Sequence, residues 1–271
     1  MSENLEDSVH ITKPIQGITV ITIDRAKRRN AVDANTARKL YKAVIDFEDD
    51  VEQKIAILNG ANGTFCAGFD LTTVKPDGLG GQPHYDTKNV SRTIGPMGPS
   101  RLQIKKPVIS AVSGYAVAGG LELSLLGDMR VVEEDAIFGV FCRRWGVPLI
   151  DGGTVRLQAV VGLGNAMDMI LTGRGVGAQE ALRMGLASRV VPKGKALEEA
   201  LALAVSLLKF PQLCMNLDRN SCYNACYNAR SFEEAMKYEF DHGVAAVAAE
   251  GAAGAKRFSD GKGRGGSFSK L

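Results

Sequence analysis

The chain has 271 residues, of which 45% are hydrophobic and 23% charged, and its 33 basic and 30 acidic residues give a formal net charge of +3. These proportions exclude disordered, collagen-like and low-complexity chains, and the charge is too even for a dedicated nucleic-acid-binding protein. A chain of this length buries roughly three-quarters of its unfolded surface, so it needs neither a disulfide nor a metal ion to fold.

The first part of the chain predicts strands that alternate with helices. The first ten residues carry acids and lack the apolar core of a targeting signal. A β-branched run predicts a strand over 17–23, and Asp33 is expected to cap a helix over 34–49. A second strand is predicted over 54–58. The stretch 73–99 is rich in Gly and Pro and is expected to be the least regular part of the chain.

The segment 107–127 has a single charge, Glu122, and its hydropathy alone would pass for a membrane span. An acid at the centre of a bilayer is costly, and several glycines interrupt the segment. A buried strand over 108–112, a glycine turn and a buried helix over 121–126 explain it better. With the next strand over 129–132, the alternation predicts an α/β layer fold and no membrane contact.

From Gly153 onward the pattern is mostly helical, with one strand at 188–191. Helices are expected over 154–161, 165–171, 178–184, 195–209, 212–228 and 231–249. The change in pattern predicts two regions, an α/β core over 1–194 and a C-terminal helical region with a basic tail over 195–271. No fixed repeat is present, which excludes solenoids and propellers.

The sequence predicts no metal or nucleotide cofactor. Its 5 cysteines form no CxxC pair and no zinc spacing with histidine, which is typical of a reducing compartment. There is no GxxxxGK[ST] phosphate loop, and the glycines at Gly162 and Gly164 fail the dinucleotide pattern at its last position.

Two glycine turns carry the chemical information. They are Phe65-Cys-Ala-Gly-Phe-Asp-Leu71 and Gly114-Tyr-Ala-Val-Ala-Gly-Gly-Leu-Glu-Leu123, and each follows a predicted strand. Glycines at a strand end allow backbone N–H groups to point at a ligand oxygen, so two facing turns would form an oxyanion hole, with Glu122 nearby as an acid or base. On spacing alone, two tight loops and a buried or capping Glu122 explain the pattern equally.

Several segments, in this order, resemble the crotonase (enoyl-CoA hydratase/isomerase) superfamily from about residue 10 to the C-terminus. The matching segments are Arg29-Asn-Ala31, the two glycine turns, Lys106-Pro-Val, Phe138-Gly139, Asp151-Gly-Gly-Thr-Val-Arg-Leu157 and Leu171-Thr-Gly-Arg174. The resemblance implies a spiral of ββα units followed by helices that trimerise. It also implies an acyl-CoA thioester as substrate, with CoA as part of the substrate and no separate cofactor.

The resemblance assigns roles to particular residues. It places the oxyanion donors at the backbone N–H groups of Ala67 and Gly119, and an acid or base at Glu122. The second carboxylate of the family's hydratases would stand four residues after Phe138, where this chain has Cys142. A thiol is not a close substitute for a carboxylate.

Asp151 is the nearest replacement, because the chain resembles dienoyl-CoA isomerases in placing an Asp just ahead of Gly-Thr. The alternative is that Asp151 caps the helix that starts near Gly153. Cys142 is expected to be a small apolar filler of the pocket, which Trp145 also lines.

CoA and substrate contacts are expected from both ends of the chain. Lys27, Arg28 and Arg29 are candidates for the phosphates, and Phe258 with Lys262 resembles the family's aromatic and lysine at the adenine end. A solvated, partly frayed surface explains these charges as well. The further substrate-binding candidates lie in the two glycine turns: Gly68, Phe69, Asp70 and Gly120.

The resemblance, with these residues, implies an enzyme that hydrates a trans-2-enoyl-CoA in fatty-acid oxidation. The alternative within the family is an enoyl-CoA or dienoyl-CoA double-bond isomerase. A further alternative is a non-catalytic CoA- or RNA-binding relative, against which the retained Glu122 argues.

Assembly and location are expected from the C-terminal part. The apolar surface of the last helices predicts a homotrimer or a hexamer. Ser269-Lys270-Leu271 matches the peroxisomal address read by an import receptor, so a eukaryotic protein would be peroxisomal. A bacterial protein would be cytoplasmic.

Overall fold

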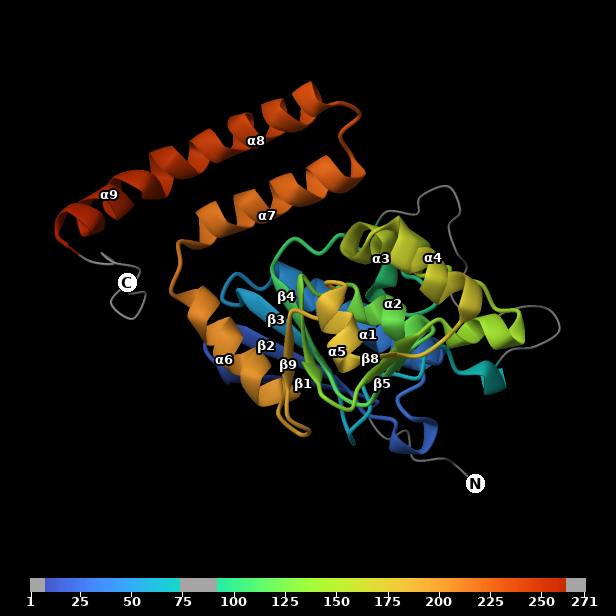
Figure 1. The fold of residues 1–271 in the computed structure, drawn as a ribbon. Helices are drawn as coiled ribbons and strands as arrows, with labels where there is room; N and C mark the ends of the chain where they lie inside the picture. Colours follow the sequence, from blue (N-terminus) through green and yellow to red (C-terminus); the bar gives the residue numbers. More distant parts are fainter. Residues whose placement is uncertain (1–7, 74–91, 262–271) are drawn as a thin grey trace. The chain divides into compact units, whose positions relative to one another are not determined.

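The computed structural model describes residues 8–73 and 92–261 and divides the chain into two compact units, Met1–Ala204 and Val205–Leu271 (Figure 1). The division after Ala204 lies ten residues beyond the expected boundary at 194. The start of helix α6 (Ala196–Leu208) belongs to the first unit, where the Ala196 N–H donates to Glu133. The expected Lys262 contact and the 269–271 address lie outside the described residues.

In the first unit, the described strands form one six-stranded sheet and one smaller sheet, and α-helices connect them. The order in the large sheet is β1-β2-β3-β4-β6-β9, parallel except for the antiparallel pair β1 and β2. These strands are β1 (Val9–Ile15), β2 (Ile18–Ile23), β3 (Ile55–Gly60), β4 (Val108–Val112), β6 (Met129–Glu133) and β9 (Arg189–Val191). The predicted α/β class is confirmed.

The central strands are apolar on both faces, as buried parallel strands are. Every residue of β4 is buried, and β2 and β3 each have one partly exposed residue. Strand β1 was not predicted from the sequence. All its residues after Val9 are exposed, so its sequence contains no apolar run. Its pairing with β2 holds it at the edge of the sheet.

The small sheet carries the second glycine turn. Strand β7 (Ile137–Gly139) pairs parallel with β5 (Tyr115–Val117) and antiparallel with β8 (Val176–Gly177). Immediately after β5, the short helix α2 (Gly119–Ser124) is buried along its whole length. The expected helix therefore starts two positions earlier, at the glycine pair itself.

The helices of the first unit follow the expected pattern. Asp33 caps α1 (Ala34–Asp49), because its side chain accepts a hydrogen bond of 2.8 Å from the Thr36 N–H. This confirms the sequence prediction, and the buried face of α1 includes Leu40, Val44 and Phe47. The helices that follow α2 are α3 (Gly153–Val161), α4 (Leu163–Thr172) and α5 (Ala178–Arg183).

The second unit is helical. Helix α7 (Gln212–Tyr227) packs against α8 (Phe232–Ala246), and a π-helical turn (Val247–Gly251) joins α8 to α9 (Ala252–Ser259) (Figure 1). The helix expected over 231–249 thus continues further. Within residues 8–73 and 92–261, no single helix is long and apolar enough to cross a membrane; only α6 and α7 taken together across a sharp bend pass that test.

Candidate active site

The first glycine turn alternates its hydrogen bonds between two neighbours. The Cys66 N–H donates to Tyr115 O (2.9 Å) and Cys66 O accepts from the Val117 N–H (3.1 Å), whereas the Ala67 N–H donates to Arg29 O (3.0 Å). The Ala67 N–H therefore points away from the second turn and is already bonded. Ala67 as an oxyanion donor is wrong, because strand geometry turns successive N–H groups to opposite sides.

The N–H of Phe69 points the other way. The Val32 N–H donates to Gly68 O (2.8 Å) and the Asp70 N–H donates to Val32 O (2.9 Å). In a trans peptide the N–H points opposite to the C=O, so the Phe69 N–H faces away from Val32. It has no hydrogen-bond acceptor within the described part of the chain, and Phe69 and Gly119 line the same cavity.

Two glycines allow the two turns to approach closely. Gly68 has φ +99°, and a Cβ on it would lie 3.0 Å from Gly119 N. A Cβ on Gly120 would lie 2.0 Å from Cys66 O, which no side chain could tolerate. Gly68 and Gly120 therefore allow the close backbone approach, and their expected substrate contacts stay predictions. The N–H groups of Phe69 and Gly119, at one cavity, are the candidate oxyanion donors.

Glu122 lies beneath the cavity on α2 and is 3% exposed. Its Oε1 accepts hydrogen bonds from the Asp151 N–H (2.9 Å) and the Gly153 N–H (2.8 Å). Burial, and secondly the negative charge of Asp151, raise the pKa of Glu122 to about 8. At neutral pH the Glu122 carboxyl therefore carries a proton.

Asp151 is equally buried, at 3% exposure, and it lines the same cavity. Its Oδ1 accepts hydrogen bonds from the Met97 N–H (3.0 Å) and from the Ser100 hydroxyl. Burial raises the pKa of Asp151 against the lowering effect of these hydrogen bonds. Helix α3 is capped by Gly152 without a side-chain hydrogen bond, so the helix-cap interpretation of Asp151 is wrong.

The cavity that joins these groups has a volume of about 150 Å³ and a mostly apolar lining. Cys142 lines it at 8% exposure, and burial followed by the charge of Glu122 raises the pKa of this thiol. Trp145 also lines it but is 70% exposed. The lining residues are Ala67, Phe69, Leu71, Pro96, Ala118, Gly119, Glu122, Phe141, Cys142, Trp145, Val147, Pro148, Ile150 and Asp151.

The expected CoA contacts are placed only in part. Lys27 and Arg28 lie in an exposed 3-10 turn, and Arg29, at its end, is exposed with φ +49°. Phe258 lies on α9 in the second unit and is 64% exposed. These contacts stay predictions.

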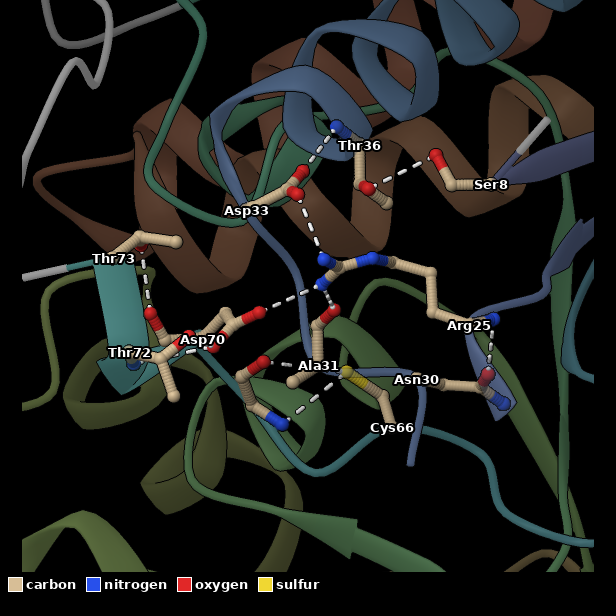
Figure 2. Close-up of polar contacts among 11 residues, drawn as sticks. Ser8, Arg25, Asn30, Ala31, Asp33, Thr36, Cys66, Asp70, Thr72 and Thr73 are labelled. Carbon is tan, nitrogen blue, oxygen red and sulfur yellow. Dashed lines mark hydrogen bonds and ion pairs between the residues drawn. The ribbon is translucent and has the colours of Figure 1, made fainter. Parts of the chain in front are cut away.

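An arginine that the sequence did not single out organises the first glycine turn (Figure 2). Arg25 pairs with Asp33 (2.8 Å) and Asp70 (3.1 Å) and donates to Ala31 O. Asp70 is 4% exposed. Burial alone would raise its pKa, but hydrogen bonds from Thr72 and Arg25, together with the charge of Arg25, lower the pKa of Asp70. Asp70 is therefore bonded within the protein, and its expected substrate contact is corrected to a structural one.

Sequence reasoning missed several groups that the structure brings to the site. Strand alternation counted from Cys66 would not have found the Phe69 N–H, because Gly68, with φ +99°, breaks the alternation between the two. Ser100 and Met97 carried no signal, because they reach Asp151 from a segment without periodicity. Within residues 8–73 and 92–261, no group of His, Cys, Asp and Glu could hold a metal ion.

Known proteins share both the sequence and the fold. The enoyl-CoA hydratase/isomerase family model matches residues 14–251. The chain is 38% identical to the enoyl-CoA hydratase EchA19 of Mycobacterium tuberculosis over 194 residues, which are 68% of this chain and 69% of that protein. It is 35% identical to the carnitinyl-CoA dehydratase of Escherichia coli over 216 residues, which are 78% of each.

Solved structures agree. A crystal structure of an enoyl-CoA hydratase from Mycobacterium tuberculosis matches with a TM-score of 0.81 at 30% identity, covering 94% of this chain and 96% of that one. The enoyl-CoA hydratase EchA1 of Mycobacterium marinum matches with a TM-score of 0.81 at 28% identity over the same shares. The chain therefore belongs to the enoyl-CoA hydratase/isomerase family, within the crotonase superfamily that its motifs resemble.

Proposed function

We propose that this enzyme adds water to a trans-2-enoyl-CoA, as a hydratase of fatty-acid oxidation. The observation that carries the proposal is the buried Glu122 carboxyl, which lies on the same cavity as Phe69 and Gly119 of the oxyanion hole. Addition of water beside a thioester builds negative charge on the thioester oxygen, and preorganised N–H groups stabilise that charge. Named relatives that are a hydratase and a dehydratase support a reaction of this class.

The raised pKa of Glu122 favours it as the acid of the pair, which leaves Asp151 as the base. The Asp151 carboxylate takes a proton from water while the water oxygen bonds to Cβ of the substrate, and the neutral Glu122 gives its proton to Cα. The C=C double bond is consumed and the thioester carbonyl is restored. The proton on Asp151 then passes to Glu122, so the pair returns to its starting state.

The site also supports these roles by geometry. Backbone N–H groups of Asp151 and Gly153 hold Oε1 of Glu122, so the other oxygen is the one that carries the transferable proton. Met97 and Ser100 hold Oδ1 of Asp151. Backbone N–H groups and one hydroxyl thus fix both carboxyls on the cavity.

Cys142 favours a second candidate, a double-bond isomerase. A thiol with a raised pKa at the place of the family's second glutamate is not a base for water, and Glu122 alone suffices to move one proton along an acyl chain. The two reactions differ in oxygen, since hydration fixes one solvent oxygen in the product and isomerisation fixes none.

The deciding experiment is turnover of a panel of trans-2-enoyl-CoA and 3-enoyl-CoA substrates in ¹⁸O-labelled water, with Glu122→Gln as the inactive control. We expect loss of the conjugated absorbance and one labelled oxygen in the product. A shifted double bond without label would replace the hydratase by the isomerase. CoA-thioester binding without any turnover would support the non-catalytic relative.

We also propose that the enzyme assembles as a trimer or a pair of trimers. Helix α8 and the π turn after it carry apolar side chains at spacings of four and three, which keeps them on one face. They are Phe232 (74% exposed), Met236 (44%), Phe240 (69%), Val244 (48%) and Val247 (70%). A stripe of this kind is typical of a subunit interface.

Light scattering tests the assembly. We expect a trimer or hexamer for the wild type and smaller species for Phe240→Glu, because a charge would be buried in the interface. Lys237→Gln is the matched control on the same helix, where the side chain is exposed and paired with Asp241. A monomer that keeps full activity would contradict the proposal.

A further inference from the structure

The direction of the Phe69 N–H depends on a single peptide plane. The carbonyl of that plane is Gly68 O, which accepts a hydrogen bond of 2.8 Å from the Val32 N–H. After Phe69, the Asp70 N–H donates to Val32 O at 2.9 Å. On the other side, the Gly68 N–H donates to Cys66 Sγ at 3.3 Å. The direction of the Phe69 N–H therefore depends on how firmly Val32 and Gly68 are held.

Arg25 contacts both chain segments that meet at this peptide plane, the one around Val32 and the one around Gly68 (Figure 2). On the side of Val32, it donates to Ala31 O and pairs with Asp33 at 2.8 Å, so it holds the residues before and after Val32. On the side of Gly68, its Nη1 pairs with Asp70 Oδ2 at 3.1 Å. One planar guanidinium thus ties the two segments together, and a guanidinium can do this because its donors lie in a fixed fork.

Asp70 receives further bonds that fix its side chain. Its Oδ1 accepts hydrogen bonds from the Thr72 hydroxyl at 2.6 Å and from the Thr72 N–H at 3.2 Å. The side chains of Arg25 and Asp70 are 17% and 4% exposed, and neither residue lines the cavity. Any effect of the pair on the reaction must therefore pass through the backbone.

We propose that Arg25 and Asp70 are positioning residues, which fix the Gly68–Phe69 peptide so that the Phe69 N–H points at the thioester oxygen. The expected effect on the reaction rate rests on the proposed function. The fixing of the Gly68–Phe69 peptide does not depend on it. A misplaced oxyanion donor is costly, because displacement by about 1 Å can cost ~10²-fold in rate.

The first test uses the free enzyme and needs no turnover. Hydrogen exchange at the Val32 and Asp70 amides reports the two bonds that flank the peptide, and we expect exchange ~10-fold faster in Asp70→Asn and in Arg25→Lys. Arg130→Lys is the matched control: Arg130 is also buried and bonds the backbone carbonyls of Leu186 and Gly127, away from the cavity. Unchanged exchange in both variants, with folded proteins, overturns the inference whatever the enzyme catalyses.

The second test separates positioning from general stability. We expect Asp70→Asn and Arg25→Lys to lower kcat by ~10- to 100-fold with KM within about threefold, and to reduce the downshift of the thioester C=O stretch in a bound acyl-CoA. Arg130→Lys should lower thermal stability without changing kcat or the carbonyl stretch.

A milder variant keeps the proposal testable if the ion-pair variants fail to fold. Thr72→Val removes one hydroxyl donor to Asp70 and leaves the Arg25 pair in place, so we expect an intermediate loss in kcat and in the carbonyl shift. Loss of kcat with an unchanged carbonyl shift would overturn the inference. A wild type that binds acyl-CoA without turning it over would overturn the proposed function alone, because the exchange and carbonyl measurements remain decisive.

Discussion

Two buried carboxylates show how differently one fold treats the same chemical group. Asp70 is 4% exposed and Glu122 is 3% exposed, yet the pKa of Asp70 is lowered and that of Glu122 is raised to about 8. The nearest charged partner of Asp70 is the Arg25 guanidinium, and the second carboxyl beside Glu122 is Asp151. Burial penalises the charge in both places. Hydrogen bonds from Thr72 and Arg25 outweigh this penalty at Asp70, whereas the charge of Asp151 adds to it at Glu122.

The difference in pKa matches the role proposed for each carboxyl. A carboxylate that stays ionised and bonded on several sides holds a structure together but has no proton to exchange. A carboxyl that is neutral near pH 7 can give and take a proton, which acid–base catalysis requires. Substitutions in the Arg25 cluster (Arg25, Asp33 and Asp70) and in the pair of Glu122 and Asp151 test this contrast.

The largest expected effect comes from removing the acid of the proposed catalytic pair, Glu122 and Asp151. Glu122→Gln keeps the shape of the side chain and its acceptor oxygen but has no transferable proton, so kcat should fall by ~10²–10⁴ with little change in acyl-CoA affinity. Steady-state kinetics and calorimetric titration with a non-reactive acyl-CoA measure the two quantities. Full activity in this variant would contradict the assignment of Glu122.

Removing the like charge should make Glu122 resemble Asp70. In Asp151→Asn the repulsion disappears, so the pKa of Glu122 should fall below about 8. Turnover should also fall, by ~10²-fold, because the second carboxylate is lost. The pH profile of kcat reports both effects, and a variant with wild-type kcat and an unshifted profile would show that Asp151 takes no part.

Removing the carboxylate of the other cluster should cost stability. Asp70→Asn leaves the mostly buried guanidinium of Arg25 with one ion pair fewer, so the free energy of unfolding should fall by ~3 kcal/mol. Urea denaturation measures it. Asp33→Ala, which removes a helix cap and the other ion pair of Arg25, is the comparison variant, and equal activity in Asp70→Asn and wild type would limit the cluster to a structural role.

The two clusters should respond oppositely to pH. The pKa of Glu122 is raised from 4.5 to about 8 on folding, so its contribution to stability is present below pH 4.5 and is lost as the pH rises through about 8. The pKa of Asp70 is lowered from 3.8, so its contribution is present above pH 3.8 and is lost as the pH falls through its folded value. Thermal unfolding between pH 5 and 8 should therefore be less pH-dependent in Glu122→Gln than in the wild type.

The smallest effect is expected at the thiol of the cavity. Cys142→Ala removes a group that is 8% exposed and whose raised pKa keeps it neutral, so kcat should stay within about threefold of the wild type. A loss of kcat as large as that of Glu122→Gln would assign Cys142 a direct part in the chemistry.

The accuracy of the sequence prediction followed the strength of local signals. The cap at Asp33 and the helix after it are local, since the Asp33 carboxylate accepts a hydrogen bond from the Thr36 N–H three residues on. Strand β1 was missed because its side chains are exposed and only its partner β2 gives it a place in a sheet. The oxyanion donor was placed at Ala67 because the sequence pattern marks the turn but not the direction of each N–H.

The α/β class, the two glycine turns and Glu122 as the candidate acid could be predicted from the sequence. Close backbone approach requires glycine, and Glu122 is the single charge in an apolar segment. Only the tertiary structure decided that Phe69 and not Ala67 offers its N–H, that Asp151 accepts from Ser100 and Met97 and caps no helix, and that Arg25 ties the site together. The reason is physical: hydrogen-bond direction and pKa depend on neighbours in space, and these neighbours come from segments far apart in the chain.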